Sequence, residues 1–315
     1  ASTFMAAIPY QFYSILALFL IPIVAFGRHD FGFMAKAEEQ ARLGLPQNIS
    51  DDEAILVSDD KKVSPWNMIL PLVILLGTIL VMFVSWGFPF QNIPGSKIRI
   101  ALTSGYLLAS IVCMIMITAQ KLMSFKETFD VFIGGIQKMG SVLVVVVLAW
   151  GVGSVCKDLG TSQFIVDSTL GLITPHVVPA LLFLVGVIIS FATGTSWGAM
   201  AILLPIGINM AVGFGVSIPM TIGAVLSGCL FGDHCSPISD TTVMSAMAAG
   251  CDLLEHTRTQ LPYAGIAALA SFVAYLILGF TNANIWIMLV VALALLIVFY
   301  LLSCRLWGVK AAESK

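Results

Sequence analysis

The stretch Gly232-Asp233-His234-Cys235-Ser236-Pro237-Ile238-Ser239-Asp240-Thr241-Thr242 is a polar segment inside a long apolar region. It carries two carboxylates, a histidine and several hydroxyl side chains. Charged groups inside a membrane are costly, so they are rare and commonly functional. Pro237 interrupts a helix and frees backbone carbonyl oxygens. Carboxylate, hydroxyl and carbonyl oxygens together suit a small hard cation or a proton.

The composition places this segment in a membrane. Of the 315 residues, 59% are hydrophobic and 10% are charged, and the mean hydropathy is +1.00. Soluble domains carry about 25% charged residues. We therefore expect an all-α polytopic membrane protein in a lipid bilayer. A nucleic-acid partner is not expected, because the 15 Lys and Arg residues are spread over loops.

Apolar runs of about 20 residues predict membrane-spanning helices. The chain has such runs at residues 5–26, 66–88, 98–119, 261–280 and 285–302. They predict scaffold helices in two regions, residues 1–120 and residues 251–315. The polar segment 27–65 predicts a solvated cytoplasmic loop. Residues 121–139 place apolar side chains at helical spacing opposite charged ones, which predicts an amphipathic helix in the membrane interface.

The region 140–250 differs from the scaffold because polar residues interrupt its apolar segments. Residues 140–172 predict a re-entrant hairpin with a polar tip. Residues 178–213 and 217–250 each predict a single crossing made of two half-helices with an unwound centre. Such irregular backbone is tolerated only when it is buried in protein or lines water, and broken helices of this kind indicate a transport site.

The distribution of charge predicts the orientation of the chain. With the loop 27–65 inside, one re-entrant hairpin and two single crossings also place the turn at residues 251–259 and the C-terminus inside. Most of the 15 Lys and Arg residues then lie on the inner side, in agreement with the positive-inside rule.

Asp233 and Asp240 are the candidate titratable groups of the site. Burial in a low dielectric favours the neutral form of a carboxyl group, so a buried carboxylate can exchange a proton for a cation. The helix break at Pro237 lets both side chains turn toward one cavity. Alternatively, one carboxylate caps the half-helix after the break, because Ser236, Ser239 and Asp240 are all possible N-cap residues.

The other interruption offers further oxygen ligands. Thr195 and Ser196 follow Gly194 at the break in residues 178–213. Their hydroxyls can complete a cation shell or cap the second half-helix, and the two roles are compatible because half-helix ends provide both.

Three other residues have a supporting or a local role. His234 is expected to hydrogen-bond the unwound backbone or to relay protons. Lys157 and Asp158, at the hairpin tip, either neutralise each other or form a gate. A zinc site is not predicted, because the His and Cys spacing matches no zinc pattern.

At these residues the chain resembles a known family. The opening stretch resembles the signature of the NhaC family of sodium/proton antiporters. Further segments similar to that family are GTSWG at residues 194–198, AWGVGSVCKDLG at 149–160 and DFGFMAKA at 30–37. The resemblance covers essentially the whole chain.

The resemblance implies the ion transporter superfamily architecture. This consists of two inverted repeats, each with scaffold helices, a re-entrant hairpin and a broken helix, in a homodimer with an elevator motion. It also implies a multi-pass protein of the bacterial inner membrane with a cytoplasmic C-terminus. Sequences of the family are longer than this chain, which contains one hairpin-plus-broken-helix set. We therefore expect an N-terminal part that carries the other half of the site.

Together these observations predict a secondary active transporter and not an enzyme. The expected activity is Na⁺/H⁺ antiport, the exchange of cytoplasmic Na⁺ for external H⁺, without a resident cofactor. Asp233 and Asp240 are expected to bind Na⁺ or H⁺. The expected assisting residues are Ser236, Thr241, Thr195 and Ser196 as further ligands, and His234, Pro237, Gly194, Lys157 and Asp158 as supporting or gating groups.

Three alternative functions compete with Na⁺/H⁺ antiport. The first is a Na⁺- or H⁺-coupled exchanger of small organic acids of the malate/lactate type, or of amino acids. The resemblance implies this alternative, because the NhaC-like proteins include such exchangers. The second is a passive channel, which needs no titratable groups. The third is an intramembrane aspartyl protease, and it is disfavoured because the Gly-x-Gly-Asp and Tyr-Asp motifs of those enzymes do not occur in this sequence.

Overall fold

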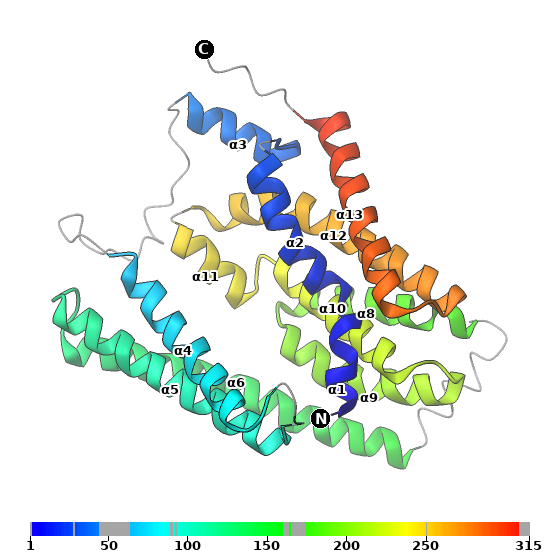
Figure 1. Ribbon diagram of the computed structural model, residues 1–315, viewed down its shortest axis with the longest axis horizontal. Helices are drawn as coiled ribbons and strands as arrows, with labels where there is room; N and C mark the ends of the chain where they lie inside the picture. The colour runs from blue at the N-terminus through cyan, green and yellow to red at the C-terminus, as the bar shows by residue number, and fades with distance from the viewer. Residues whose placement is uncertain are drawn as a thin grey trace. The chain divides into compact units, whose positions relative to one another are not determined.

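The computed structural model describes residues 2–27, 29–43, 64–88, 91, 93–159, 164, 174–249 and 251–308. The regular elements of these residues are helices, accompanied by an isolated β-bridge (Figure 1). The chain forms two compact units, Ile55–Ser141 and a larger unit made of Ser2–Ala54 with Val142–Lys315.

Apolar helices long enough to cross a membrane are the main feature of both units. Within the described part of the chain, six helices meet this criterion of length and composition, and a bent helix pair at the start of the chain would be a seventh. The prediction of a polytopic α-helical membrane protein is thereby confirmed.

The smaller unit is built on two long helices, α4 (Trp66–Ser85) and α5 (Gly95–Ala119). The side-chain amide of Asn67 donates from Nδ2 to Oε1 of Gln120 at 3.0 Å. Because Asn67 begins α4 and Gln120 follows α5, the pair shows that the helices are antiparallel. Gly105 lets α5 approach α4 closely, since a Cβ there would lie 3.1 Å from the carbonyl oxygen of Leu75. These helices confirm the predicted spans at 66–88 and 98–119.

Helix α6 (Phe125–Asp158) is longer than the sequence predicts. It begins with a reciprocal cap, in which the Ser124 amide donates to Glu127 Oε2 at 2.8 Å and the Glu127 amide donates to Ser124 Oγ at 3.3 Å. The predicted boundary at residues 139–140, between an amphipathic helix and a hairpin limb, is not a break. A glycine costs a helix only about 1 kcal/mol, and the helix continues through this glycine-containing stretch. The second limb of the hairpin lies outside the described residues except for Phe164, so the hairpin stays a prediction.

The larger unit contains the remaining helices. Their bounds, in chain order, are α1 (Ser2–Ala7), η1 (Ile8–Tyr10), α2 (Phe12–Gly27), α3 (Gly32–Arg42), η2 (Pro175–Val177), α8 (Val178–Thr193), α9 (Ser196–Phe214), α10 (Ile218–Cys235), α11 (Asp240–Ala249), α12 (Leu253–Thr281) and α13 (Ile285–Trp307).

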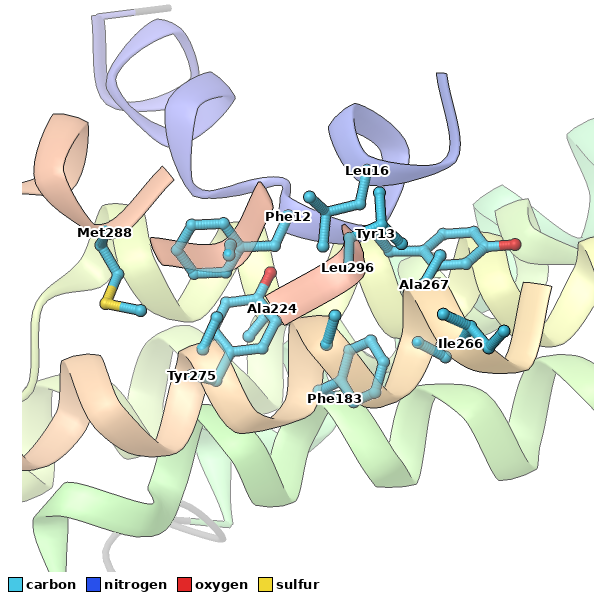
Figure 2. Packing of buried hydrophobic residues seen from close by; sticks show 14 of the residues in the cluster. Phe12, Tyr13, Leu16, Phe183, Ala224, Ile266, Ala267, Tyr275, Met288 and Leu296 are labelled. Atoms are coloured by element: carbon cyan, nitrogen blue, oxygen red, sulfur yellow. The ribbon is translucent and has the colours of Figure 1, made fainter. Parts of the chain in front are cut away.

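The core of this unit lies where α2, α8, α10, α12 and α13 meet. Tyr275 and Phe12 are fully buried there, with ring centroids 4.8 Å apart, and Figure 2 shows them among the side chains of this cluster. Inside a membrane, helices associate through close packing rather than through removal of apolar surface from water. Gly232 provides such packing, because a Cβ there would lie 2.5 Å from the carbonyl oxygen of Val187 on α8.

Contacts at one end of the larger unit show which segments lie together. The Tyr263 hydroxyl of α12 donates to Asp30 Oδ1 at 2.6 Å, and Phe31 forms a β-bridge with Gly308. The segment after α2, the beginning of α12 and the end of α13 therefore lie at the same end of the helices. The basic residues of these three segments therefore share one end of the helices.

Helices α8 and α9 correct one prediction. A Cβ on Gly207 of α9 would lie 3.4 Å from Leu182 of α8. These two residues lie at similar distances before and after the interruption, so α9 runs back along α8. The predicted single crossing over residues 178–213 is therefore wrong. The cause is local, because Gly194 ends α8 in the left-handed conformation with φ of 65° and Thr195 begins α9 from extended backbone.

Candidate functional site

The sequence predicts two interruptions, which the structure places at residues 194–195 and 236–239, and the two lie in direct contact. A Cβ on Gly194 would lie 2.8–2.9 Å from Ile238 atoms, including its backbone carbonyl. The Ser236 hydroxyl donates to the carbonyl oxygen of Phe191 at 2.8 Å. The tip of the α8–α9 hairpin therefore rests on the segment between α10 and α11.

Asp233 lies at the centre of this junction, in the last turn of α10, and only 7% of its surface is exposed. Ser239 donates to its Oδ1 at 2.8 Å, and Ser196 donates to its Oδ2 at 3.1 Å. Thr241 donates to the same Oδ2 at 3.4 Å and lies 2.8 Å from the Ser239 hydroxyl. Hydrogen bonds to ionised groups are stronger than those between neutral groups, and a buried charge needs them.

The backbone carbonyls at the end of α10 are already occupied by donors. The Asp233 carbonyl accepts from the Ser236 amide at 3.1 Å and from the Thr242 hydroxyl at 3.4 Å. The His234 carbonyl accepts from Nε2 of Gln260 at 2.8 Å. Carbonyls at a helix end normally lack intrahelical partners. The freed carbonyls that the sequence suggests as cation ligands are thus partly used for capping here.

The interruption around Pro237 is a turn. The Ser239 amide donates to the Ser236 carbonyl at 3.2 Å, which places Pro237 at the second position of the turn, where proline is favoured. This turn returns the Ser239 side chain toward Asp233. Pro237 therefore shapes the site without contributing a side-chain ligand.

The predicted ligand residues divide into two groups. Asp233, Ser196 and Thr241 are brought together as the sequence suggests. Thr195 caps α9, because its Oγ1 accepts from the Gly198 amide at 3.4 Å, and Ser236 binds the backbone of α8. For these two residues the geometry favours the capping interpretation.

Asp240 is exposed and is the first residue of α11. A carboxylate at this position interacts favourably with the helix dipole. In the described contacts it is not joined to the Asp233 carboxylate. The interpretation of Asp240 as part of a helix start therefore fits the structure better than a shared two-carboxylate site.

The predicted supporting residues lie in different surroundings. His234 is exposed, and its Nδ1 lies 2.6 Å from the Tyr13 hydroxyl. Asp158 is exposed at the end of α6, and the side chain of Lys157 lies outside what the structure describes. A gate formed by Lys157 and Asp158 stays a prediction.

Four residues that contact the site are not among the predicted ligands. Ser239 and Thr242 lie inside the opening stretch, where their hydroxyls are visible, but sequence spacing does not separate capping from coordination. Tyr13 and Gln260 come from distant helices and carry no local signal.

The donor set determines which ligands the site can take. It offers one buried carboxylate and hydroxyl oxygens, and among the described residues no group of three His, Cys, Asp or Glu side chains is placed to hold a metal ion. A hydroxyl can donate to a carboxylate or turn its lone pairs toward a cation. The site can therefore hold a proton or a small hard cation.

Comparison with known proteins assigns a family to this arrangement. Residues 1–280 match the model of the Na⁺/H⁺ antiporter family. The Malate-2H(+)/Na(+)-lactate antiporter of Bacillus subtilis is 28% identical over 66% of this chain and 43% of its own length. The Arginine/ornithine antiporter ArcD of Halobacterium salinarum is 32% identical over 48% of the chain and 32% of its own length. The Na(+)/H(+) antiporter NhaC of Alkalihalophilus pseudofirmus is 27% identical over 40% of the chain and 27% of its own length.

The matched segments cover 43% or less of the length of these three relatives, and the chain spans 59% of the length of an uncharacterized protein of Haemophilus influenzae to which it is 27% identical. No solved structure is significantly similar to it.

Proposed function

The chain belongs to the Na⁺/H⁺ antiporter family, and we propose that it forms the Asp233 cation site of a secondary active transporter that exchanges cytoplasmic Na⁺ for external H⁺. The observation that carries the proposal is the buried Asp233 carboxylate with three hydroxyl donors. Na⁺ and H⁺ are the transported substrates, and no resident cofactor is needed.

Competition for one carboxylate couples the two ions. Taking an uncompensated charge out of water costs several kcal/mol or more. The protein is therefore not expected to move the site from one side of the membrane to the other while the Asp233 carboxylate is ionised and has no bound cation. A proton on Asp233 or a Na⁺ beside it removes that charge. Since both ions use the same oxygen atoms, binding of one displaces the other. The site therefore carries Na⁺ across the membrane in one direction and H⁺ in the other.

The hydroxyls allow one site to serve both ions. Beside the ionised carboxylate, Ser196, Ser239 and Thr241 act as donors. When Na⁺ arrives, the same oxygens can point lone pairs at the cation, because a hydroxyl hydrogen rotates freely. The Ser239–Thr241 pair lets these reorientations occur together.

The sidedness follows from charge. In the larger unit, Lys36, Arg42, Arg258 and Arg305 all belong to the segment after α2, the start of α12 or the end of α13. The positive-inside rule assigns this end to the cytoplasm. We propose a multi-pass protein of the bacterial inner membrane with a cytoplasmic C-terminus, assembled as a homodimer.

Inside-out membrane vesicles that contain the full-length protein test the proposal. With an acidic interior established, addition of Na⁺ is expected to collapse the pH gradient, measured by dequenching of a pH-sensitive dye. Asp233→Asn is expected to lower this response by about a hundredfold or more, because an amide carries no charge and takes up no proton in this pH range.

Asp240→Asn is the matched control, since it makes the same change seven positions later at an exposed site. Its Na⁺ response is expected to stay within about twofold of wild type. Retention of Na⁺-driven collapse by Asp233→Asn, with both proteins present in equal amounts, would contradict the proposal.

A second candidate function is exchange of small organic acids or amino acids coupled to Na⁺ or H⁺. The similarity to the malate/lactate and arginine/ornithine antiporters favours it. The same vesicles decide between the two. Collapse of the gradient by Na⁺ alone supports Na⁺/H⁺ antiport, whereas collapse that requires malate, lactate or arginine supports the organic exchanger.

A further inference from the structure

The start of the larger unit is bent where the sequence predicts an unbroken span over residues 5–26. The α1–η1 segment meets α2 at an angle of 46°. A Cβ on Gly223 of α10 would lie 2.5 Å from the Cβ of Tyr10, at this bend. Tyr275 of α12 donates to the Tyr10 carbonyl at 2.6 Å. The end of η1, directly before α2, is therefore held by both α10 and α12.

Tyr13 lies in the first turn of α2 and extends to the site. It is 2% exposed, and Figure 2 shows it among the side chains of the core cluster. Its ring packs edge-on against Phe231 with centroids 5.2 Å apart. Its hydroxyl lies 2.6 Å from Nδ1 of His234. A residue of α2 thus binds the residue next to Asp233.

His234 is held at two points by helices outside the α8–α11 segment. Its side chain binds Tyr13 of α2, and its carbonyl accepts from Gln260 of α12 at 2.8 Å. The last turn of α10 precedes the interruption, and the end of a helix frays unless its groups are bound. These two contacts therefore fix the turn that carries Asp233.

We infer that Tyr13 is a positioning residue of the cation site, which acts through His234 to keep the Asp233 carboxylate facing Ser196 and Ser239. The inference rests on the proposed function and adds a contribution from α2 to it. The Tyr13–His234 hydrogen bond acts as a tether between α2 and the end of α10. This role requires a polar atom at the position of His234 Nδ1, and it requires no change in the protonation of His234.

The tether makes a specific kinetic prediction. Without it, only a fraction of the molecules hold Asp233 in the binding orientation, and the apparent affinity falls by that fraction. Loss of one such hydrogen bond in Tyr13→Phe is expected to raise the KM for Na⁺ by roughly three- to tenfold. The maximal rate is expected to stay within about twofold, because Asp233 and its hydroxyl donors are unchanged.

The experiment measures Na⁺-driven collapse of the pH gradient in vesicles of the full-length protein over a range of Na⁺ concentrations. His234→Ala is expected to raise the KM like Tyr13→Phe, and the double variant is expected to be no worse than His234→Ala, because both remove one contact. His234→Asn, whose amide lies close to the position of Nδ1, is expected to restore most of the affinity. Tyr300→Phe is the control, since its hydroxyl binds the His29 carbonyl at 2.7 Å, away from Asp233.

The outcomes separate the tether from other roles. An unchanged KM in Tyr13→Phe, additive effects in the double variant, or failure of His234→Asn to restore affinity would overturn the inference. A lower thermal stability with wild-type KM would also overturn it, because that result indicates packing alone. If wild-type vesicles show no Na⁺-driven collapse at all, the proposed function fails and not only this refinement of it.

Discussion

The two interruptions in the larger unit use the same residue types for different purposes. At residues 194–195, Thr195 caps a helix and the chain reverses direction. At residues 236–239, Ser239 turns its hydroxyl to a buried carboxylate. At each interruption one hydroxyl binds a backbone group and another donates to Asp233, since Thr195 is followed by Ser196 and Ser236 precedes Ser239. A hydroxyl beside a helix break therefore indicates a binding site only when a buried charge lies within its reach.

The largest expected effect concerns the contact between the interruptions. Gly194→Ala places a side chain in the left-handed region, at a cost of about 1–2 kcal/mol, and also puts a Cβ against the Ile238 backbone. Gly215→Ala has the same backbone strain, with φ of 67°, but no atom within 4 Å of the new Cβ. Thermal unfolding of the full-length protein in detergent is expected to show a clearly larger loss of stability for Gly194→Ala.

Equal losses of stability in the two glycine variants would show that the two interruptions are not tightly packed against each other. The position of Ser196 beside Asp233 would then not depend on this contact. A larger loss in Gly194→Ala instead shows that the hairpin tip is packed tightly against the turn at Pro237.

The sequence alone predicts most of the membrane helices and the two interruptions of the larger unit. Length and apolarity suffice for α4, α5, α12 and α13, and Gly194 and Pro237 mark the two interruptions. The direction of the chain after a break depends on a few backbone dihedral angles. The sequence therefore did not reveal that α9 runs back along α8, and it did not reveal the bend before α2.

The composition of the site was only partly predictable, for a related reason. Asp233, Ser196 and Thr241 stand out as polar residues in apolar surroundings, and the structure brings them together. Ser236 and Thr195 stand out equally, yet they bind backbone groups. Which hydroxyl meets the carboxylate is decided by rotation around the turn at Pro237, and sequence spacing does not encode that rotation.

A second prediction compares two serines of the same turn. Ser239→Ala removes the 2.8 Å donor to Asp233 Oδ1, and hydrogen bonds to charged groups contribute about 1.5–3 kcal/mol. The KM for Na⁺ is expected to rise by about tenfold or more. Ser236→Ala removes a bond to the Phe191 carbonyl, so it is expected to lower thermal stability and leave the KM within about twofold. Similar KM values in the two variants would mean that the turn does not distinguish coordination from capping.

The smallest expected effects separate two adjacent residues at the hairpin tip. Thr195→Ala removes an N-cap, which costs about 1 kcal/mol of stability, and its hydroxyl does not contact Asp233 in the described structure. Ser196→Ala removes the 3.1 Å donor to Oδ2 and is expected to raise the KM for Na⁺ by roughly threefold or more. Thermal unfolding and Na⁺ titration of both variants check this pair. If Thr195→Ala raises the KM as much as Ser196→Ala does, the first interruption contributes ligands through its backbone as well. Both interruptions would then supply ligands to one cation site, and Thr195 would not be only a helix cap.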